Sequence, residues 1–402
     1  MKIVVASYGS RGDVEPGAAV ARELLRRGHD VRMAVPPNML DFVESAGLAA
    51  VSYGPDARER MNPAQDLVRD LATKLHNPIG ILSEVTEHVS RVTADKSAAL
   101  TSLAHGVDLL LASFNEQGLA ANVAEYHGIP LAALHFFPKR IWASGQLAPL
   151  VTREAEHAQR RLLGLPETSE SALQRRAQRG WLEIQAYDEF CLPGPTAQWV
   201  EPDGLRPFVG ALTLELPTED DAEVLSWIAA GTPPIYFGFG STPITSWAET
   251  VTMIGTVCAE LGERALICSG ANDFSDVLPP EGVKVVRAVN HAAIFPACRA
   301  VVHHGGAGTT AAGMRAGIPT LILWLWLDQP IWAAAVERLQ VGLGRPFWAA
   351  TSQSLLDDLR AILAPQCSAR ATEVAARMST SADSVVRAAD LLEDAARLDS
   401  VD

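Results

Sequence analysis

The chain has 402 residues and a formal net charge of −14, and hydrophobic residues make up 48% of it. This length and composition are those of a globular protein with two or three domains. The negative charge, without any local basic stripe, excludes nucleic acid as an expected partner.

The five cysteines are scattered, and no two of them have the C-x-x-C spacing. This pattern argues against a disulfide framework and a structural zinc site, and it favours a reducing compartment. The first apolar run, residues 3–6, is too short for a signal peptide. The longest, residues 318–327, is about half of what a membrane-spanning helix requires. We therefore expect a cytoplasmic chain, with any membrane contact peripheral.

The N-terminal stretch predicts a β-loop-α-β unit. Residues 2–6 have the pattern of a short strand and residues 7–15 that of a polar loop. Pro16 suits the first position of a helix that ends at Gly28, and residues 31–35 form the next predicted strand. Units of this kind build parallel sheets with right-handed connections.

The same alternation continues further along the chain. Strands are predicted at 107–112 and 129–135, on either side of a helix at 118–127. Segments 56–100 and 139–185 are more helical and polar. We interpret both as helical insertions around the N-terminal sheet.

Proline and glycine crowd together between residues 192 and 217, which is the strongest linker signal in the chain. The strand-helix alternation then restarts, and residues 369–398 are predicted to be helical. The expected strands of this second half are residues 235–239, 265–268, 283–286, 300–303 and 320–325.

We therefore predict an α/β protein with two Rossmann-like parallel-sheet domains that face each other across a cleft. The predicted N-terminal domain covers residues 1–200, and a linker covers 201–218. The predicted C-terminal domain covers residues 219–402 and includes a closing C-terminal helix.

Three glycine-containing loops follow predicted strands, at the sheet edge where α/β proteins bind ligands. They read YGSRGDVEP at 8–16, FGFGSTP at 237–243 and HHGGAGTT at 303–310. In the third loop the glycines allow a tight turn, and a helix is predicted near Thr309. The first amides of a helix lack internal partners and carry partial positive charge, so a diphosphate fits there.

Two common nucleotide motifs are absent. No lysine follows the third loop's glycines, as a P-loop requires. The first loop has only Gly9 and Gly12 of a G-x-G-x-x-G fingerprint, and no acidic residue ends the second strand at Val35. A dehydrogenase is therefore disfavoured.

Four motifs occur in a fixed order: GSRGDVEP at 9–16, VNH at 289–291, HHGGAGTT at 303–310 and DQP at 328–330. In this order they resemble family 1 nucleotide-sugar glycosyltransferases of the GT-B fold. The likeness is greatest to the actinobacterial branch, which glycosylates glycopeptide antibiotics and mycobacterial glycopeptidolipids.

The resemblance implies an inverting hexosyltransferase that needs no metal. It also implies that the N-terminal domain, 1–200, binds the acceptor and that the C-terminal domain, 219–402, binds the nucleotide sugar. The donor would be a UDP- or dTDP-hexose, with a 6-deoxyhexose such as rhamnose as one candidate. The acceptor would be a hydroxyl of a lipid, a glycopeptidolipid or a natural product. No Asp-x-Asp motif of the kind that holds a metal-diphosphate occurs in the chain.

The resemblance also implies residue roles. Asp13 matches the catalytic base, and His304 matches the diphosphate histidine best, with His303 as runner-up. Val289 and Asn290 match the nucleobase segment, whereas Asp328 and Gln329 match the pair that holds donor-sugar hydroxyls. The full donor set is Ser10, Gly12, Ser241, Val289, Asn290, His303, His304, Gly305, Gly306, Gly308, Thr309, Asp328 and Gln329.

Each role has a structural alternative. Asp13 and Asp328 can cap helices, and His303 can support a turn. The aromatic run at the end of a predicted strand can line an acceptor pocket or pack in the core, and the tryptophans can stack on a sugar or pack internally. The aromatic run is His135, Phe136 and Phe137, and the tryptophans are Trp324, Trp326 and Trp332. Asn115 and Glu116 also lie at the end of a predicted strand and have no assigned role.

Two other functions fit a chain of this architecture. A nucleotide-sugar 2-epimerase needs further acids and bases around the sugar, and the sequence does not supply them as a set. A helper subunit that activates another glycosyltransferase is expected to lose the base or the diphosphate histidine. Both Asp13 and His304 are present.

Overall fold

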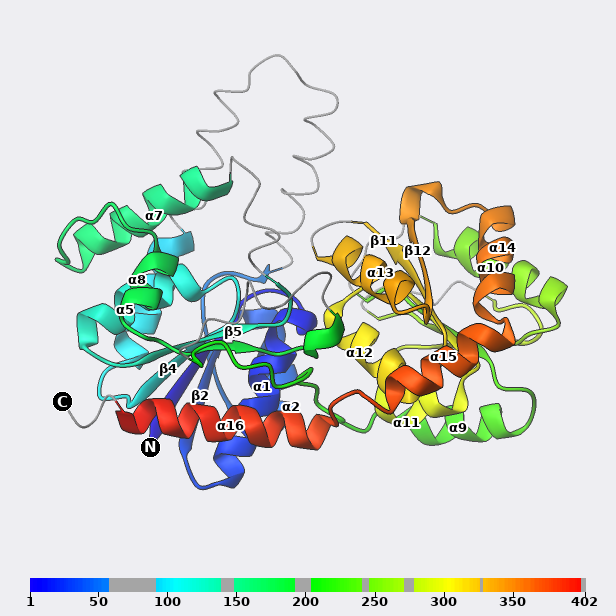
Figure 1. The fold of residues 1–402 in the computed structure, drawn as a ribbon, viewed down its shortest axis with the longest axis horizontal. Coiled ribbons are helices and arrows are strands. Elements are labelled where there is room, and N and C mark those ends of the chain that lie inside the picture. Colours follow the sequence, from blue (N-terminus) through cyan, green and yellow to red (C-terminus); the bar gives the residue numbers. More distant parts are fainter. Residues whose placement is uncertain are drawn as a thin grey trace, which may run out of the picture. The chain divides into compact units, whose positions relative to one another are not determined.

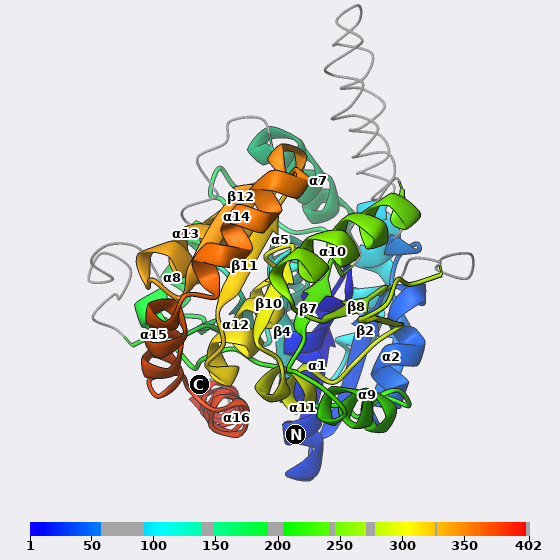
Figure 2. The ribbon, with the colours of Figure 1, turned by 90° about the vertical axis from the view of Figure 1, so that its right-hand side faces the viewer.

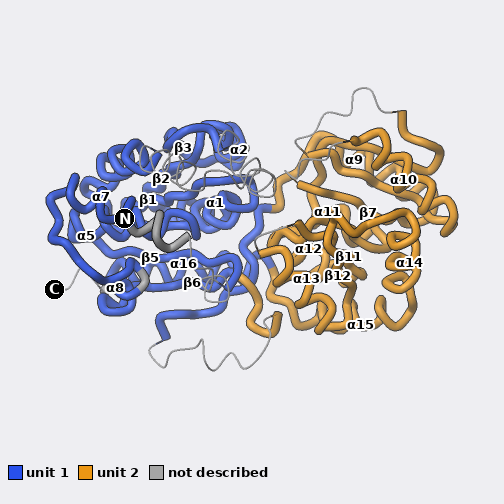
Figure 3. Tube along the Cα trace, turned by 90° about the horizontal axis from the view of Figure 1, so that it is seen from above, with its two compact units in different colours: residues 1–186, 197–214, 381–402 blue, residues 187–196, 215–380 orange. Residues whose placement is uncertain are grey.

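The computed structural model describes residues 1–57, 92–138, 148–191, 204–240, 246–270, 278–325 and 328–398. The chain divides into two compact units (Figure 3). Unit 1 comprises Met1–Ala186, Ala197–Leu214 and Ser381–Asp402, and unit 2 comprises Tyr187–Thr196 and Glu215–Thr380. Among the described residues, each unit contains one six-stranded sheet, and the strand pairs are parallel. The predicted α/β architecture with two parallel sheets is confirmed.

The sheet of unit 1 has the strand order β3-β2-β1-β4-β5-β6, a doubly wound Rossmann order. Strands β2, β4 and β5 of this sheet are labelled in Figure 1. Its strands are β1 (Lys2–Ala6), β2 (Asp30–Val35), β3 (Ala49–Ser52), β4 (Leu109–Ala112), β5 (Leu131–His135) and β6 (Glu183–Gln185). Its main helices are α1 (Arg11–Arg26), α2 (Leu40–Ser45), α5 (Gln117–His127), α7 (Ala148–Leu162), α8 (Ala172–Gln178) and α16 (Ser381–Leu398).

Unit 2 has the order β12-β11-β10-β7-β8-β9. Its strands are β7 (Ile235–Gly238), β8 (Ala265–Cys268), β9 (Val283–Val286), β10 (Ala300–His303), β11 (Thr320–Trp324) and β12 (Gly342–Pro346). Its helices include α9 (Asp221–Ala229), α10 (Trp247–Leu261), α11 (His291–Ile294), α12 (Ala307–Ala316), α13 (Gln329–Arg338), α14 (Ser352–Ile362) and α15 (Pro365–Ala375).

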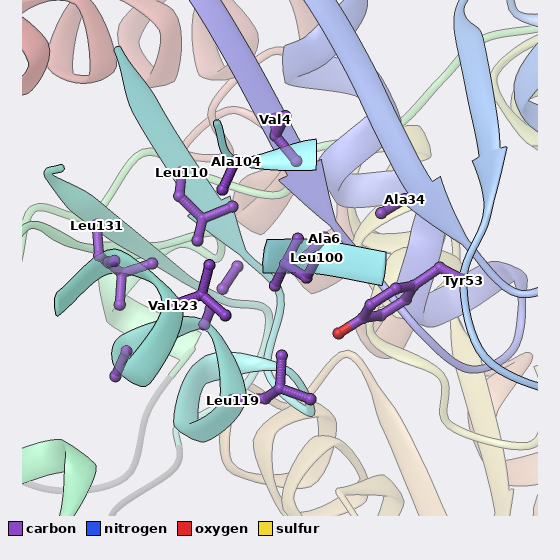
Figure 4. Packing of buried hydrophobic residues seen from close by; sticks show 14 of the residues in the cluster. Val4, Ala6, Ala34, Tyr53, Leu100, Ala104, Leu110, Leu119, Val123 and Leu131 are labelled. Atoms are coloured by element: carbon purple, nitrogen blue, oxygen red, sulfur yellow. The ribbon is translucent and has the colours of Figure 1, made fainter. Parts of the chain in front are cut away.

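Alternating side chains of the central strands fill two layers in unit 1. Val4 and Ala6 of β1 join a core with Leu110 of β4 and Leu119 of α5 (Figure 4). Successive strand residues point to opposite faces, so Val5 lies on the other side of the sheet, beside Gly17 of α1. Helices therefore cover both faces, and the ligand-accessible part of the sheet is its edge.

Unit 2 is layered in the same way (Figure 2). One core lies between the sheet and helices α10 and α14, and a second lies on the side of α9 and α11. No helix of the described residues has the length and apolar character needed to cross a bilayer.

Some predicted details were wrong. Strands β3, β6 and β12 were missed, and all three lie at sheet edges. Helix α1 begins at Arg11, not at Pro16. Ser10 caps the helix and Asp13 completes a capping box, so the helix starts earlier than the proline signal suggested. Pro16 is tolerated inside α1, and the residue four positions before its ring is Gly12.

Helix α16 belongs to unit 1, although we predicted it as part of the C-terminal domain. It packs on α1. Arg27, which caps α1, donates to Asp390 at 2.7 Å, to Glu393 at 3.2 Å and to the Val386 carbonyl at 3.2 Å. Glu393 also pairs with the His29 ring at 2.7 Å. A charged network thus ties the C-terminal helix to the first β-α-β unit.

We expect Arg27→Ala to destabilise unit 1 by about 2 kcal/mol, because a largely buried guanidinium loses several charge-assisted hydrogen bonds. Arg26 is the matched control, since its side chain is 71% exposed and pairs with Glu23 of its own helix. Arg26→Ala should change the free energy of unfolding by less than about 0.5 kcal/mol. Denaturant melts of both variants measure the difference, and equal losses would contradict the role given to Arg27.

Candidate functional site

The first candidate region lies where β1 gives way to α1. Asp13 sits in the first turn of the helix, and its Oδ2 accepts from the Ser10 backbone N–H at 2.7 Å and from the Ser10 hydroxyl at 2.9 Å. Gly9 has a φ of 141°, and a Cβ there would overlap the Asp13 carboxylate. The loop therefore closes tightly over one oxygen of Asp13. The capping role is real, and it leaves Oδ1 outside the cap.

The surroundings of Asp13 favour its protonated form. Burial raises the pKa of Asp13 above its ordinary value, the two bonds from Ser10 lower it, and the nearby Glu116 carboxylate raises it. Oδ1 lies 3.4 Å from the side-chain nitrogen of Asn115. A carboxylate with a raised pKa is a stronger base, as proton abstraction from a hydroxyl requires.

A buried charged network lies next to Asp13. Glu116 is fully buried, and its carboxylate accepts from Lys96 at 2.6 Å and from the Tyr53 hydroxyl at 2.5 Å. The Lys96 ammonium lies 4.1 Å from the centre of the Tyr8 ring. Sequence reasoning missed Lys96 and Tyr53. The one sequence feature that pointed to this network was the position of Glu116 after the end of a predicted strand.

The second region lies in unit 2, where β10 gives way to α12. Gly306 is the N-cap of α12, and no described side chain caps this helix. The first-turn amides therefore lack internal partners. Gly308 is exposed and Thr309 is half-buried in that first turn. The predicted helix start near Thr309 lies two residues from the observed one, Ala307.

His303 supports this turn from within. It is fully buried, and its Nδ1 accepts from the Gly305 backbone N–H at 3.0 Å. Burial holds the pKa of His303 well below its usual value, so the ring is neutral and its proton resides on Nε2. Gly305 has a φ of 95°, which favours glycine. The turn-support alternative for His303 is thus favoured.

His304 is placed differently. It is partly exposed, and its ring lies beside Gly306 and Gly240, so a Cβ on either glycine would fall within 2.8 Å of a ring atom. Burial lowers the pKa of His304 to about 4, while the Gly238 backbone partly counteracts this shift. A neutral imidazole at the N-terminus of α12 can donate a hydrogen bond without adding a charge.

The segment after β9 has mainly internal contacts. Val289 is buried in the unit 2 core. The Asn290 side chain accepts from the Ala292 N–H at 3.1 Å and caps α11, while the Asn290 N–H donates to Asp221 at 2.8 Å. A nucleobase contact by Val289 or Asn290 would therefore use the backbone of this segment. Ser241 lies outside the described residues.

The acidic-amide pair opens helix α13. Asp328 is its N-cap, and Asp328 Oδ2 accepts from the indole N–H of Trp332 at 3.0 Å. Gln329 is buried, and its Oε1 accepts from the Leu325 N–H at 2.7 Å. Asp328 is the more accessible of the two predicted sugar-binding side chains. Trp332 is buried, so it packs internally.

The aromatic run after β5 is buried. Phe136 and Phe137 pack with Phe114, with ring centroids 6.2 and 4.2 Å from it. The His135 ring lies 3.2 Å from Glu183 and is 2% exposed. These positions favour the core alternative over the acceptor pocket.

The two regions have complementary chemistry. Asp13 offers a held carboxylate of raised pKa next to a strand end. The turn at 303–309 offers unpaired helix amides, a neutral histidine and a hydroxyl, which together suit an anion such as a diphosphate. In the described part of the chain, no three His, Cys, Asp or Glu side chains gather as a metal-binding group.

Comparison with known proteins identifies the chain. Residues 3–143 match the glycosyltransferase family 28 N-terminal domain, and residues 256–393 match the C-terminal domain of erythromycin biosynthesis protein CIII-like proteins. An uncharacterized glycosyltransferase of Mycobacterium tuberculosis (strain ATCC 25618 / H37Rv) is 58% identical over 99% of both chains. The vancomycin aglycone glucosyltransferase of Amycolatopsis orientalis is 30% identical over 98% of each chain.

Solved structures agree on the fold. The crystal structure of glycosyltransferase VinC in complex with dTDP superposes with a TM-score of 0.67 at 18% identity, over 99% of this chain and 100% of that one. The sequence relatives and the two-sheet architecture lead to the same assignment, and the chain belongs to the glycosyltransferases of the GT-B fold.

Proposed function

We propose that this protein transfers a hexose from a UDP- or dTDP-sugar to an acceptor hydroxyl, with inversion at the sugar carbon and without a metal ion. Asp13 removes the proton of the attacking hydroxyl, and the turn after β10 stabilises the departing nucleotide diphosphate. The acceptor is a lipid, a glycopeptidolipid or a natural product, and a lipid acceptor would bring the protein to a membrane surface.

The observation that carries this proposal is the construction of the turn at 303–309. The His303–Gly305 hydrogen bond of 3.0 Å fixes the backbone ahead of α12, and none of the described side chains caps the start of this helix. Its amides are preorganised for the charge that develops on a leaving diphosphate, so no reorganisation is needed as the bond breaks. His304 adds a neutral donor beside Gly306.

The base role follows from the environment of Asp13. Ser10 orients the carboxylate through two hydrogen bonds, and burial raises its pKa. General-base assistance typically accelerates such a step by about 10²–10⁴-fold. Proton transfer would be late, as the acceptor oxygen bonds to the sugar carbon.

The donor proposal draws on Asp328 and on the relatives. The Asp328 carboxylate is held by Trp332 at 3.0 Å and can accept from sugar hydroxyls. VinC was crystallised in complex with dTDP, and the Amycolatopsis relative is a glucosyltransferase. We extend these donor classes to this chain and include a 6-deoxyhexose such as rhamnose. None of the five cysteines, all of which lie in the described ranges, forms a disulfide, and this fits a reducing cytoplasm.

The direct test is nucleotide binding. UDP or dTDP present at about 100 times its Kd should raise the melting temperature by several degrees, since ligand binding adds roughly 2.7 kcal/mol of stability. His304→Ala should weaken diphosphate affinity about tenfold by calorimetry, as one hydrogen bond to a charged group is lost.

His105→Ala is the control, because His105 is an exposed histidine of unit 1. It should leave nucleotide affinity unchanged. Hexose transfer should persist in EDTA, and a complete loss restored by magnesium would contradict the metal-free mechanism. Absence of any UDP or dTDP binding to the native chain would overturn the proposed function.

A further inference from the structure

A tryptophan pair with one exposed ring lies at the carboxyl edge of the unit 2 sheet. Trp324 is the last residue of β11, and Trp348 lies in the short turn Phe347–Ala349 directly after β12. Their ring centroids are 5.2 Å apart and their planes are inclined by 85°, an edge-to-face contact. Trp348 is 67% exposed, whereas Trp324 is half-buried. One indole thus supports another that offers its surface to solvent.

The strand order places this pair relative to the candidate diphosphate turn. That turn follows β10, and β11 and β12 are the next two strands in one direction. Neighbouring strands lie about 4.8 Å apart, so the end of β12 is roughly 10 Å from the end of β10. The segment matched to the nucleobase follows β9, at the opposite edge of the sheet.

A nucleotide sugar bound at the turn has two ends. If the base points toward β9, the sugar points toward β11 and β12. Asp328 is the N-cap of α13, the helix that follows β11 in the chain. The carboxylate held by Trp332 would then meet hydroxyls at the rim of the sugar ring. The exposed indole of Trp348 would lie on the same side of the diphosphate.

A pyranose ring has polar edges and at least one apolar C–H face. Flat aromatic side chains pack against such faces while nearby carboxylates bind the hydroxyls at the edge. Single exposed apolar side chains are common and need no explanation. Here the exposed indole of Trp348, the Trp324 indole that packs against it and the Asp328 carboxylate all follow or end neighbouring strands at the carboxyl edge of one sheet.

We infer that Trp348, braced by Trp324, is a stacking surface for the C–H face of a pyranose ring. This inference rests on the proposed function, because the turn after β10 defines which side the sugar occupies. Two sources supply the same chemistry: the hexose of the donor, and a sugar already attached to the acceptor. An alkyl chain or a membrane is a different class of partner, which the experiment distinguishes.

Two substitutions in the full chain separate stacking from simple apolar contact. Trp348→Leu keeps an apolar side chain but removes the flat ring, and Trp348→Tyr keeps a ring. Calorimetry measures the Kd of UDP-glucose against UDP, and of dTDP-glucose against dTDP. A second arm measures 4-nitrophenyl glucoside against 4-nitrophenol, with UDP already bound.

The Leu variant should weaken binding of one sugar-bearing probe about fivefold to tenfold, and the Tyr variant should recover most of that affinity. Affinity for UDP and dTDP should not change. Loss in the first arm identifies the donor hexose, and loss in the second identifies an acceptor sugar. Leu162→Ala, which shortens a 73% exposed side chain in unit 1, is the control and should change neither arm.

The inference would be overturned if the native chain and Trp348→Leu bound the sugar-bearing probes with equal affinity in both arms. Binding of both proteins to phosphatidylglycerol vesicles is measured as well. If Trp348→Leu loses only vesicle binding, the inference is also overturned, because the surface would then serve an apolar partner. If the native chain binds neither UDP nor dTDP, the proposed function fails first. If it binds them and the Leu variant keeps its sugar affinity, the stacking inference alone fails.

Discussion

Asp13→Asn is expected to lower kcat for hexose transfer by about 10²–10⁴-fold, while the Kd for UDP or dTDP stays within about twofold of the native value. The amide keeps the shape of the side chain and an oxygen that can accept from Ser10. It cannot take up a proton from the acceptor hydroxyl. Steady-state kinetics and calorimetry on the same preparation separate the two quantities.

The pH profile gives a second readout of the same role. A base works when it is deprotonated, so activity should fall as the pH drops through the pKa of Asp13. Burial raises the pKa of Asp13, so this acidic limb should lie above the range of an ordinary aspartate. The residual activity of Asp13→Asn should lack the limb. If Asp13→Asn showed the same fall in activity at acidic pH, that fall would belong to the titration of another group.

Asp41→Asn is the matched control for this substitution. Asp41 is exposed and lies in the first turn of α2, in the same unit. The change in charge and shape is identical, so kcat should remain within about twofold. Full transfer activity in Asp13→Asn would remove the base assignment and leave Asp13 as a helix cap.

The sequence predicted those parts of the fold whose signals are local. The strand at 300–303, its glycine turn and the following helix were recognised because an apolar run meets glycines within a few residues. Strands β3, β6 and β12 were missed because their sequences, AAVS, EIQ and GLGRP, lack a run of large apolar side chains. The residues of β12, GLGRP, contain two glycines and a proline.

Features made by distant residues were not predictable from pattern. Helix α16 joins unit 1 through Arg27 and Asp390, which are 363 positions apart in the sequence. The buried Lys96–Glu116 pair and the Tyr53 hydroxyl likewise come from separate segments. Sequence periodicity carries no information on such pairings, although it located Asp13 and both histidines at strand ends.

Gly305→Ala is expected to reduce the affinity for UDP or dTDP by about 100-fold or more. Gly305 has a φ of 95°, and a Cβ there would lie 2.8 Å from Ile322 Cγ2 and 3.0 Å from Gln329 Cβ. The backbone must move to relieve these contacts, so the hydrogen bond from its N–H to His303 is disturbed and the amides of α12 are displaced. Losing two hydrogen bonds from backbone N–H groups to a charged diphosphate corresponds to roughly 3–6 kcal/mol of binding free energy.

Gly282→Ala separates this effect from the general strain of a left-handed residue. Gly282 is in the same unit with a φ of 78°, and no atom of a described residue lies within 4 Å of its added Cβ. It should lose about 1–2 kcal/mol of stability and keep its nucleotide affinity. Gly305→Ala should lose more stability, because overpacking adds about 1–3 kcal/mol. If a folded Gly305→Ala variant binds the nucleotide as well as Gly282→Ala does, the diphosphate does not bind at the turn after β10.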